Sequence, residues 1–339
     1  MDVTRERRRL ESLPRRLWGE FFPGKVFWWF VFHVIKTRPD VLWVHQIGTR
    51  FPRSIFVFTK LFGIKTVWTI HDFGLILPRK LYPRDLGILD SAVDTFIDQL
   101  QSFSHDKHKL KFSGIDYSLI LKMRLVVVRA LARLCSQMIF ISSMQQQIYS
   151  CFGIHSKVVI SNGIEPCACK VSSKARFRNS ILFAGRATGK GFEQLLNALV
   201  ENPEMHLHLA GGPELKLQAK RRLESSRFSY HGMLNSSEIH SLLHSVEMVS
   251  VASECFDVYP TITLEALRYG SFPITTKVTG NFPLVKSISP RLILEYGKSI
   301  DLNAISSSID FSSTWGKEVR DNLPTVKQVL AEYQSYLIN

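Results

Sequence analysis

The sequence predicts an α/β protein of two Rossmann-like, doubly wound domains. Short apolar runs typical of strands alternate with segments of helical spacing through most of the chain, and this alternation favours parallel sheets. It is lost over Glu165–Asn179, where Pro, Cys, Lys and Ser replace the periodic residues and indicate a linker. The length of 339 residues suits two domains that each bury a core of their own.

Residues 1–165 form the predicted N-terminal domain. Its strand-like runs are Asp40–His45, Lys65–His71, Met138–Ser142 and Val158–Ser161. Helical spacing over Ser54–Phe62 separates the first two runs, and this order of strand, helix and strand predicts a parallel pair. A basic helix is expected over Leu119–Leu134, whereas Arg79–Ser118 shows no clear periodicity.

Residues 180–322 form the predicted C-terminal domain, which follows a linker over 166–179. Its expected strands are Ser180–Ala184, His206–Ala210, Phe228–His231, Met248–Ala252 and Phe272–Thr275. Its expected helices are Phe192–Val200, Glu214–Glu224, Ser236–Ser245 and Thr263–Arg268. The remaining residues, 323–339, contain one more helical pattern, Val326–Leu337, which we expect to pack back on the N-terminal domain.

The positive charge of the chain is concentrated in its N-terminal half. The formal net charge is +14, and residues 1–165 carry 24 Lys and Arg against 13 Asp and Glu. Such a half attracts phosphate groups in nucleic acid, anionic lipid or a phosphorylated acceptor, and the alternative reading is a solubilising surface. Nucleic acid is not expected, because no aromatic-basic strand motif, zinc-finger spacing or basic-region heptad is present.

Cysteine usage and hydropathy indicate a cytoplasmic protein that can contact a membrane from one side. The five cysteines are irregularly spaced and predict no disulfide framework. The apolar run Val26–Ile35 is too short for a bilayer, which requires about twenty residues. It suits a buried or amphipathic helix, and an interfacial membrane contact is the alternative. The aromatic part, Phe27–Phe32, requires a cover, for which the last helix, a protein partner and a membrane are the candidates.

The first candidate site is the segment Gly185–Gly191, between a predicted strand and a predicted helix. Its glycines allow close approach of a ligand to the backbone, and a helix N-terminus favours an anion. Arg186 and Lys190 add two positive charges, which suits the clamp that a diphosphate leaving group requires. The spacing is not that of a Walker loop. A glycine-rich turn with solvated charges is the alternative reading.

The second candidate site places two carboxylates eight positions apart, Asp257 and Glu265. The segment before Pro260 is expected to be a loop and the segment after it a helix start, since Pro suits the first helical turn. The free backbone N–H groups around Thr261 and Ile262 can then bind an anion, and Glu265 can accept hydrogen bonds from a ribose diol. Alternatively, Asp257 caps the helix and Glu265 lies on the surface.

Several segments together resemble glycosyltransferase family 4, the group 1 glycosyltransferases with the GT-B fold. They are FAGRATGKGFEQLLNAL, LHLAGG, YHGMLNSSEIHSLL and DVYPTITLEALRYGSFPI in the C-terminal half, and RPDVLWVH, TVWTIHDF, MIFISSMQQQI and VVISNGI in the N-terminal half. The resemblance covers roughly residues 36–290. It implies two Rossmann-like domains with a cleft between them.

The resemblance also implies roles for individual residues. Arg186 and Lys190, together with Gly185, match positions that bind the nucleotide diphosphate, and Asp257 matches the acid that contacts the transferred sugar. Glu265 matches the acid that contacts ribose. His71 matches a histidine near the donor sugar.

The sequence departs from the family pattern at several positions. Asp257 replaces the usual Glu, Arg186 and Lys190 are closer together than usual, and Thr279–Asn281 stands where a Gly-Gly turn is common. At the start of the chain, a basic and aromatic helix leads directly into the strand at Asp40. The family's first strand and its Gly-rich loop have no candidate, so the resemblance implies an N-terminal domain that is shortened at its start. The alternatives are a truncated chain, a wrongly assigned start, and a domain that a partner completes.

The resemblance implies sugar transfer with retention of anomeric configuration and without a cofactor or a required metal, the nucleotide-diphosphate sugar being the donor substrate. On the acceptor side we expect His45, Arg129 and Arg133 to contribute. The expected partners are a nucleotide sugar, a glycan or lipid-linked acceptor, an anionic membrane surface, and a protein partner or second copy. The main alternative is a catalytically degenerate subunit that binds a nucleotide sugar or supports a partner. A sugar-nucleotide epimerase and a nucleic-acid-binding protein are weaker alternatives.

Overall fold

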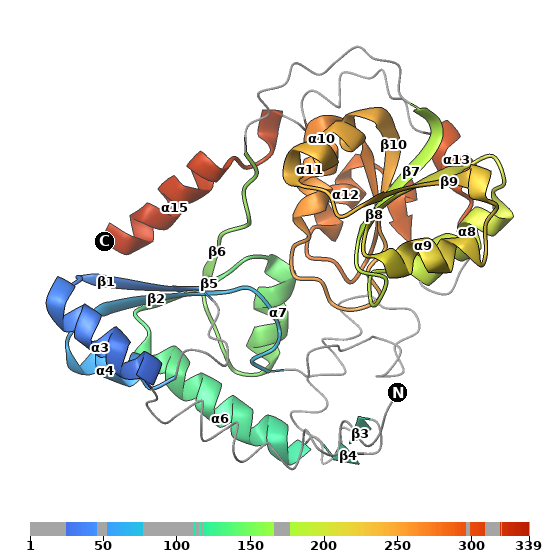
Figure 1. Cartoon of the computed structure of the whole chain (residues 1–339). Helices are drawn as coiled ribbons and strands as arrows, with labels where there is room; N and C mark the ends of the chain where they lie inside the picture. The colour runs from blue at the N-terminus through green and yellow to red at the C-terminus, as the bar shows by residue number, and fades with distance from the viewer. Residues whose placement is uncertain are drawn as a thin grey trace.

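The structure is a computed structural model in which two α/β bodies are joined side by side (Figure 1). It describes residues 25–45, 53–76, 111–112, 115–116, 118–165, 177–295, 299–308, 319 and 321–338, with residues 111–121 and 338 described by their backbone alone. Within these residues no helix is both long enough and apolar enough to cross a bilayer. The segment 77–110, most of the stretch without periodicity, lies outside the described residues.

The N-terminal domain is built around a parallel sheet of four strands in the order β1-β2-β5-β6. Its strands are β1 (Val41–His45), β2 (Lys65–Ile70), β5 (Gln137–Phe140) and β6 (Val158–Val159), and its helices are α3 (Lys25–Thr37), α4 (Ile55–Leu61), α6 (Ser118–Leu134) and α7 (Ser143–Cys151). All four strands were predicted, and each observed strand lies within the predicted range except for Gln137. A short antiparallel pair, β3 (Lys111–Phe112) and β4 (Ile115–Asp116), was not predicted.

The strand order of this sheet runs in one direction only. Right-handed crossovers between strands added in one direction place every connecting helix on the same face. Accordingly α3, α4, α6 and α7 share one core, which includes Phe56, Trp68, Phe140 and Tyr149. Among the described residues, the double winding expected for this domain is therefore not seen, because a reversal of strand order is required for it.

A helix from the other end of the chain covers the second face of this sheet. In α15 (Val326–Ile338), Tyr333 packs with Val67 and Ile139 of the sheet, and its ring lies 4.6 Å from that of Trp43. Figure 1 shows α15 on one side of β1 and β2, with α3 and α4 on the other. The last helix thus packs on the N-terminal domain, but it does not cover the aromatic residues of α3.

The C-terminal domain has a six-stranded parallel sheet in the order β12-β11-β10-β7-β8-β9. Its strands are β7 (Phe177–Gly185), β8 (His206–Gly211), β9 (Phe228–Gly232), β10 (Val246–Val251), β11 (Phe272–Thr276) and β12 (Ile293–Leu294). The order runs outward from β7 to β9 and then restarts from β10 to β12 on the other side. This sheet is therefore doubly wound, and its order reverses between β7 and β10.

Helices cover both faces of the C-terminal sheet. They are α8 (Phe192–Glu201), α9 (Pro213–Lys220), α12 (Phe282–Ile288) and α13 (Leu302–Ser308) on one face, and α10 (Ser236–Ser245) and α11 (Thr261–Tyr269) on the other. The apolar spacing that predicted α8 is the cause of its burial, since Phe192, Leu195, Leu196 and Leu199 all face the core. The predicted linker ended too late, because Phe177–Asn179 already belong to β7, where Phe177 pairs with Val246.

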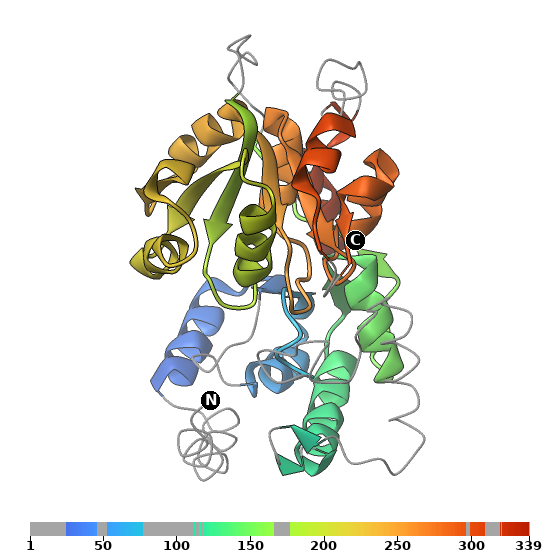
Figure 2. The ribbon, with the colours of Figure 1, turned by 90° about the vertical axis from the view of Figure 1, so that its right-hand side faces the viewer.

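The chain crosses between the domains at two points that lie against each other. Ile164 and Thr325 form a parallel bridge, with Ile164 N–H donating to Pro324 O at 3.0 Å and Val326 N–H donating to Ile164 O at 3.1 Å. Gly163 allows this approach, because a Cβ there would lie 2.7 Å from the backbone of Thr325. Figure 2 shows the C-terminal domain above the N-terminal domain.

Candidate functional site

The loop after β7 is positioned at the reversal of strand order in the C-terminal sheet. In open α/β sheets, ligands bind outside the carboxyl ends of the strands at this point, because the crossovers on its two sides diverge. The loop contains Gly185 and Gly191, with φ angles of +146° and +71° that L side chains rarely adopt. A Cβ at Gly185 would meet nothing within 4 Å, whereas at Gly191 it would lie 1.8 Å from Ala252 O. Gly191 is therefore required by the contact with the loop after β10, whereas Gly185 faces open space.

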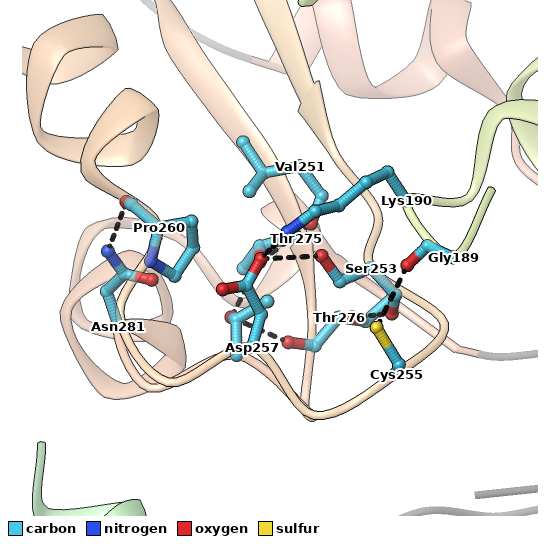
Figure 3. Close-up of polar contacts among 11 residues, drawn as sticks. Gly189, Lys190, Val251, Ser253, Cys255, Asp257, Pro260, Thr275, Thr276 and Asn281 are labelled. Carbon is cyan, nitrogen blue, oxygen red and sulfur yellow. Dashed lines mark hydrogen bonds and ion pairs between the residues drawn. The ribbon is translucent and has the colours of Figure 1, made fainter. Parts of the chain in front are cut away.

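The loops after β7 and β10 meet at an ion pair. Lys190 Nζ donates to Asp257 Oδ2, and Ser253 Oγ donates to the same oxygen at 3.1 Å (Figure 3). The Lys190 side chain is 34% exposed and the Asp257 side chain 16%, so a charged ligand can reach the lysine from solvent. The predicted diphosphate-binding lysine and the predicted sugar-binding acid are thus brought together from positions 67 residues apart.

Buried hydroxyl and amide side chains at and after the end of β11 hold the Asp257 loop in place. Thr276 Oγ1 donates to Ser253 O at 2.7 Å, and Asn281 Nδ2 donates to Pro260 O at 2.8 Å (Figure 3). The backbone of Asp257 itself is fixed at both ends, because its N–H donates to Val278 O and its carbonyl accepts from Gly280 N–H. These bonds determine where the carboxylate points.

Sequence reasoning missed these supporting residues. Ser253 contacts Asp257 directly, and Thr276 and Asn281 fix its loop. Gly280 was noted only as a departure from a family pattern, whereas a Cβ there would lie 1.6 Å from Val258 O. The available signal was the run of small hydroxyl and amide residues at the carboxyl end of a buried strand, where side chains meet neighbouring loops.

The start of α11 presents backbone N–H groups beside this loop. Its N-cap, Pro260, has no side chain that can accept from them, and Asp257 is not the cap, which excludes that alternative. Thr261 is exposed and Ile262 is half-buried. Because the dipole of this nine-residue helix favours negative charge at its start, these N–H groups suit an anionic oxygen.

Glu265 lies one turn into α11 and is half-buried rather than a surface residue. Burial raises the pKa of this carboxyl, and the nearby His240 offsets part of the increase. Tyr269 Oη and His240 Nδ1 are 2.9 Å apart, so the imidazole is held next to the helix. A carboxylate in such a position is available to accept hydrogen bonds from a diol that enters from the side of the loop.

On the N-terminal side, two histidines end neighbouring strands. His45 is the last residue of β1 and His71 directly follows β2, and His45 Nδ1 lies 2.9 Å from His71 Nε2. Burial lowers the pKa of both rings. His71 further lowers that of His45, whereas Asp72 offsets part of the effect at His71. Two neutral rings can share one hydrogen bond, in which one nitrogen donates and the other accepts.

Contacts between the domains bring the segment after His71 to the segment before Asp257. The rings of Phe73 and Phe256 lie 6.2 Å apart in an edge-to-face arrangement. Val258 is buried in the core of the N-terminal domain, although it belongs to the C-terminal domain in sequence. Tyr259 is hydrogen-bonded to Ser161. The Asp257 loop is therefore in contact with both domains.

The remaining predicted residues are more dispersed. Arg186 is exposed on the loop after β7. Arg129 and Arg133 are exposed on α6, but Arg129 Nε donates to Phe152 O at 2.8 Å and thereby satisfies a carbonyl at the end of α7. The predicted acceptor-side role of Arg129 thus competes with a structural one.

A second histidine cluster lies away from this site, on β8 and β9. His208 Nδ1 and His231 Nε2 are 3.1 Å apart, and Phe177 stacks on His208. Burial, together with His206 and His231, lowers the pKa of His208 to about 4. Within the described part of the chain, no group of three or more His, Cys, Asp or Glu residues has the arrangement needed to hold a metal ion.

Comparison with known proteins identifies the domain that contains the ion pair. Residues 170–304 match the model of the family Glycosyl transferases group 1. This segment is a group 1 glycosyltransferase domain. Gly185, Lys190, Asp257 and Glu265 all lie in it. No curated protein resembles the chain closely enough in sequence to count as a relative.

Solved structures extend the likeness to both domains. Sucrose-phosphate synthase from Thermosynechococcus elongatus has a TM-score of 0.61 at 16% identity, covering 91% of this chain and 75% of its own. HepE of Anabaena, in complex with UDP and glucose, has a TM-score of 0.61 at 19% identity, covering 93% and 84%. A glycosyltransferase from Rickettsia africae has a TM-score of 0.59 at 15% identity, covering 91% and 79%.

These likenesses concern the fold, which is that of GT-B glycosyltransferases. They confirm the predicted fold class, and the group 1 domain over residues 170–304 supports the predicted family and the predicted enzyme class, that of sugar-transferring enzymes (EC 2.4).

Proposed function

We propose that this glycosyltransferase moves a sugar from a nucleoside diphosphate to a hydroxyl of a glycan or lipid-linked acceptor, with retention of configuration, in the synthesis of a glycan or cell-surface polysaccharide. The observation that carries the proposal is the meeting of Lys190 and Asp257 at the switch point of the C-terminal sheet. A cation for the diphosphate and a carboxylate for the sugar hydroxyls are there held within one hydrogen bond of each other.

Each residue has a distinct task in this proposal. Lys190 and Arg186 stabilise the negative charge that develops on the departing diphosphate. The backbone N–H groups of Thr261 and Ile262 bind an oxygen of the same group, and Glu265 accepts hydrogen bonds from ribose. Asp257 orients the sugar, and its loop is rigid enough to do so because Ser253 and the β11 end hold it.

The transfer step follows from these positions. An acceptor oxygen bonds to the anomeric carbon on the face from which the diphosphate leaves, and the bond from that carbon to the phosphate oxygen breaks. The acceptor proton passes to the leaving diphosphate oxygen, so atoms and charge balance. No metal or cofactor is required, because side-chain cations and backbone N–H donors offset the charge of the leaving group.

His71 is proposed to orient the donor sugar, and His45 to face the acceptor. Because burial lowers the pKa of both rings, they are neutral at pH 7 and can donate and accept hydrogen bonds without adding charge beside the sugar. Their position after β1 and β2 supports this arrangement, since the Asp257 loop contacts the same domain.

We further propose a cytoplasmic enzyme that associates with an anionic membrane surface, where a lipid-linked acceptor is embedded. The support is the positive charge of the N-terminal half, which contains 24 Lys and Arg but 13 Asp and Glu. A protein partner or second copy remains part of the proposal, since a sheet of four described strands has edges that pair readily.

The test is a transfer assay with a panel of UDP-, GDP- and ADP-sugars, starting from UDP-glucose because HepE is known in complex with it. Products are analysed by nuclear magnetic resonance for anomeric configuration, with and without EDTA. Retention without loss in EDTA supports the proposal. An inverted product contradicts the mechanism, and an EDTA-sensitive rate contradicts the metal-free leaving-group step. Tight donor binding without any transfer over a broad acceptor set supports the degenerate-subunit alternative instead.

A further inference from the structure

Helix α3 exposes large apolar side chains on the face opposite its core. Phe27, Phe30, Val31 and Val34 face the N-terminal core. On the other side Trp28 is 61% exposed, Trp29 57%, Phe32 64% and Ile35 55%. Two tryptophans and a phenylalanine on one exposed helix face are unusual in a soluble surface, where large apolar patches mark interaction sites.

The neighbouring helix α4 extends this surface. Phe58 of α4 packs against Phe27 and Phe30 of α3, with ring centroids 6.2 and 6.1 Å apart, so the two helices lie side by side. At the end of α4, Leu61 is 79% exposed and Phe62 is 59% exposed. We call Trp28, Trp29, Phe32, Ile35, Leu61 and Phe62 together the aromatic face.

The charges among these side chains have a single sign. Lys25 and Lys36 lie at the two ends of α3, and Lys60 lies on α4; all three are exposed. Neither helix contains an Asp or Glu. Tryptophan with flanking lysine is the composition of the interface between lipid tails and headgroups, because indole rings are amphipathic and lysine chains can reach the phosphates.

The length and position of α3 suit a helix that lies in the plane of a membrane. Thirteen residues give a length of about 20 Å, which is shorter than the roughly 30 Å of the hydrocarbon core. The face is separate from the donor loops, which belong to the C-terminal domain, and α15 lies on the opposite side of the sheet (Figure 1). Contact with a bilayer through α3 and α4 therefore leaves the Lys190 and Asp257 loops free.

We propose that the aromatic face binds an anionic lipid bilayer, with α3 parallel to the surface and Trp28, Trp29 and Phe32 inserted among the headgroups. A second copy of the chain fits this face less well, because a symmetric contact would bring the lysines of both copies together. The inference deepens the proposed function, on which it rests for the lipid-linked acceptor, whereas the membrane contact itself is tested without donor or acceptor.

The experiment is sedimentation of the full chain with phosphatidylcholine vesicles that contain about 30% phosphatidylglycerol, compared with pure phosphatidylcholine. The test variant is Trp28→Ser/Trp29→Ser/Phe32→Ser. Its matched control, Val200→Ser/Leu217→Ser/Met233→Ser, removes three exposed apolar side chains from the C-terminal domain. The expected result is a fall in partitioning of at least about tenfold for the test variant, equivalent to about 1.4 kcal/mol, and none for the control.

Two further measurements distinguish insertion from simple charge attraction. Lipids brominated near the headgroup are expected to quench the fluorescence of the bound wild type, and Trp28→Phe/Trp29→Phe is expected to bind while losing most of that quenching. Lys25→Glu/Lys36→Glu is expected to weaken binding to the anionic vesicles. Donor binding, measured by titration without vesicles, is expected to be the same in all these variants, so that failure of the transferase proposal would be seen separately.

The proposal is overturned if the wild type does not sediment with the anionic vesicles at low salt. It is also overturned if the test variant binds them as well as the control does. A third contradicting result is a concentration-dependent dimer, seen by light scattering, that the test variant abolishes while vesicle binding is unchanged. The aromatic face would then be an interface between copies.

Discussion

Replacing Lys190 by Ala tests the diphosphate site most directly. A charge-assisted hydrogen bond to a phosphate oxygen contributes about 1.5–3 kcal/mol to binding. In the free protein, however, Lys190 is paired with Asp257, and partly exposed pairs of this kind contribute about 0.2–1 kcal/mol that the ligand must offset. The difference, about 0.5–2.8 kcal/mol, corresponds to a Kd for nucleoside diphosphate that is about 2- to 100-fold weaker.

The assay is isothermal titration of wild type and Lys190→Ala with a nucleoside diphosphate and with the nucleoside alone. The nucleoside diphosphate is the one among UDP, GDP and ADP that gives the largest thermal shift. The nucleoside is expected to bind equally to both proteins, since it lacks the phosphates that Lys190 contacts. Arg222→Ala is the control, because it removes an equal charge and a pair with Glu193 at 3.7 Å elsewhere in the domain.

Asp257→Asn is expected to have the opposite effect on nucleoside diphosphate binding. It releases Lys190 and removes a negative charge beside the diphosphate, so nucleoside diphosphate binding should tighten while turnover falls for want of the sugar contact. The reasoning is refuted if Lys190→Ala weakens nucleoside and nucleoside diphosphate alike, or if Arg222→Ala has the same effect as Lys190→Ala.

Other substitutions test the loop, the ribose acid and the histidine cluster. Burial raises the pKa of Glu265, so ionisation of this carboxyl costs stability above about pH 4.3. Glu265→Gln should therefore raise the melting temperature at pH 7.5 but not at pH 4. The same substitution should lower donor affinity, and an unchanged affinity would contradict the ribose role. Gly191→Ala should destabilise the protein more than Gly232→Ala. Both glycines have φ near +70°, which costs an alanine about 1–2 kcal/mol, but only the Cβ at position 191 meets Ala252 O. Equal melting temperatures of the two variants would contradict this. Because the pKa of His208 falls from 6.5 to about 4 in the folded protein, its contribution to stability should be complete above pH 6.5 and decline toward pH 4. His208→Gln should therefore flatten the dependence of melting temperature on pH between pH 4 and 6.5. An unchanged slope would contradict this role of His208.

The periodic helices and strands could be predicted from the sequence, because the spacing of their apolar residues reflects which face of each element is buried. The helix Ser236–Ser245 has its predicted bounds, and Asn235 caps it while Glu238 completes the capping box. Strand ends were less accurate, because pairing rather than hydrophobicity sets them. Phe177 and Asn179 look like linker residues, yet Phe177 pairs with Val246, and Asn179 N–H donates to Glu247 Oε2.

Long-range relationships were beyond sequence patterns. Residue types identified Lys190 and Asp257 separately, but their contact depends on the reversal of strand order between β7 and β10, which no local pattern contains. Likewise, Gly280 is required by Val258 O, and that contact appears only after the loop has folded. The outward direction of Trp28 and Trp29 follows from which side of α3 meets the sheet, and the nearly continuous apolar run Val26–Ile35 did not reveal this.

The covering of the N-terminal sheet by α15 has a consequence for how the protein is assembled and dismantled. During synthesis, Val67 and Ile139 lack their cover until Tyr333 has emerged, so the domain that is made first is completed last. The paired crossings at Ile164 and Thr325 act as a two-stranded joint, in which neither segment can swing without the other. A protease that cuts once between Ile164 and Phe177 would therefore not liberate the N-terminal half. The two fragments would stay together, because helix α15 belongs to the C-terminal fragment and packs on the sheet of the N-terminal fragment.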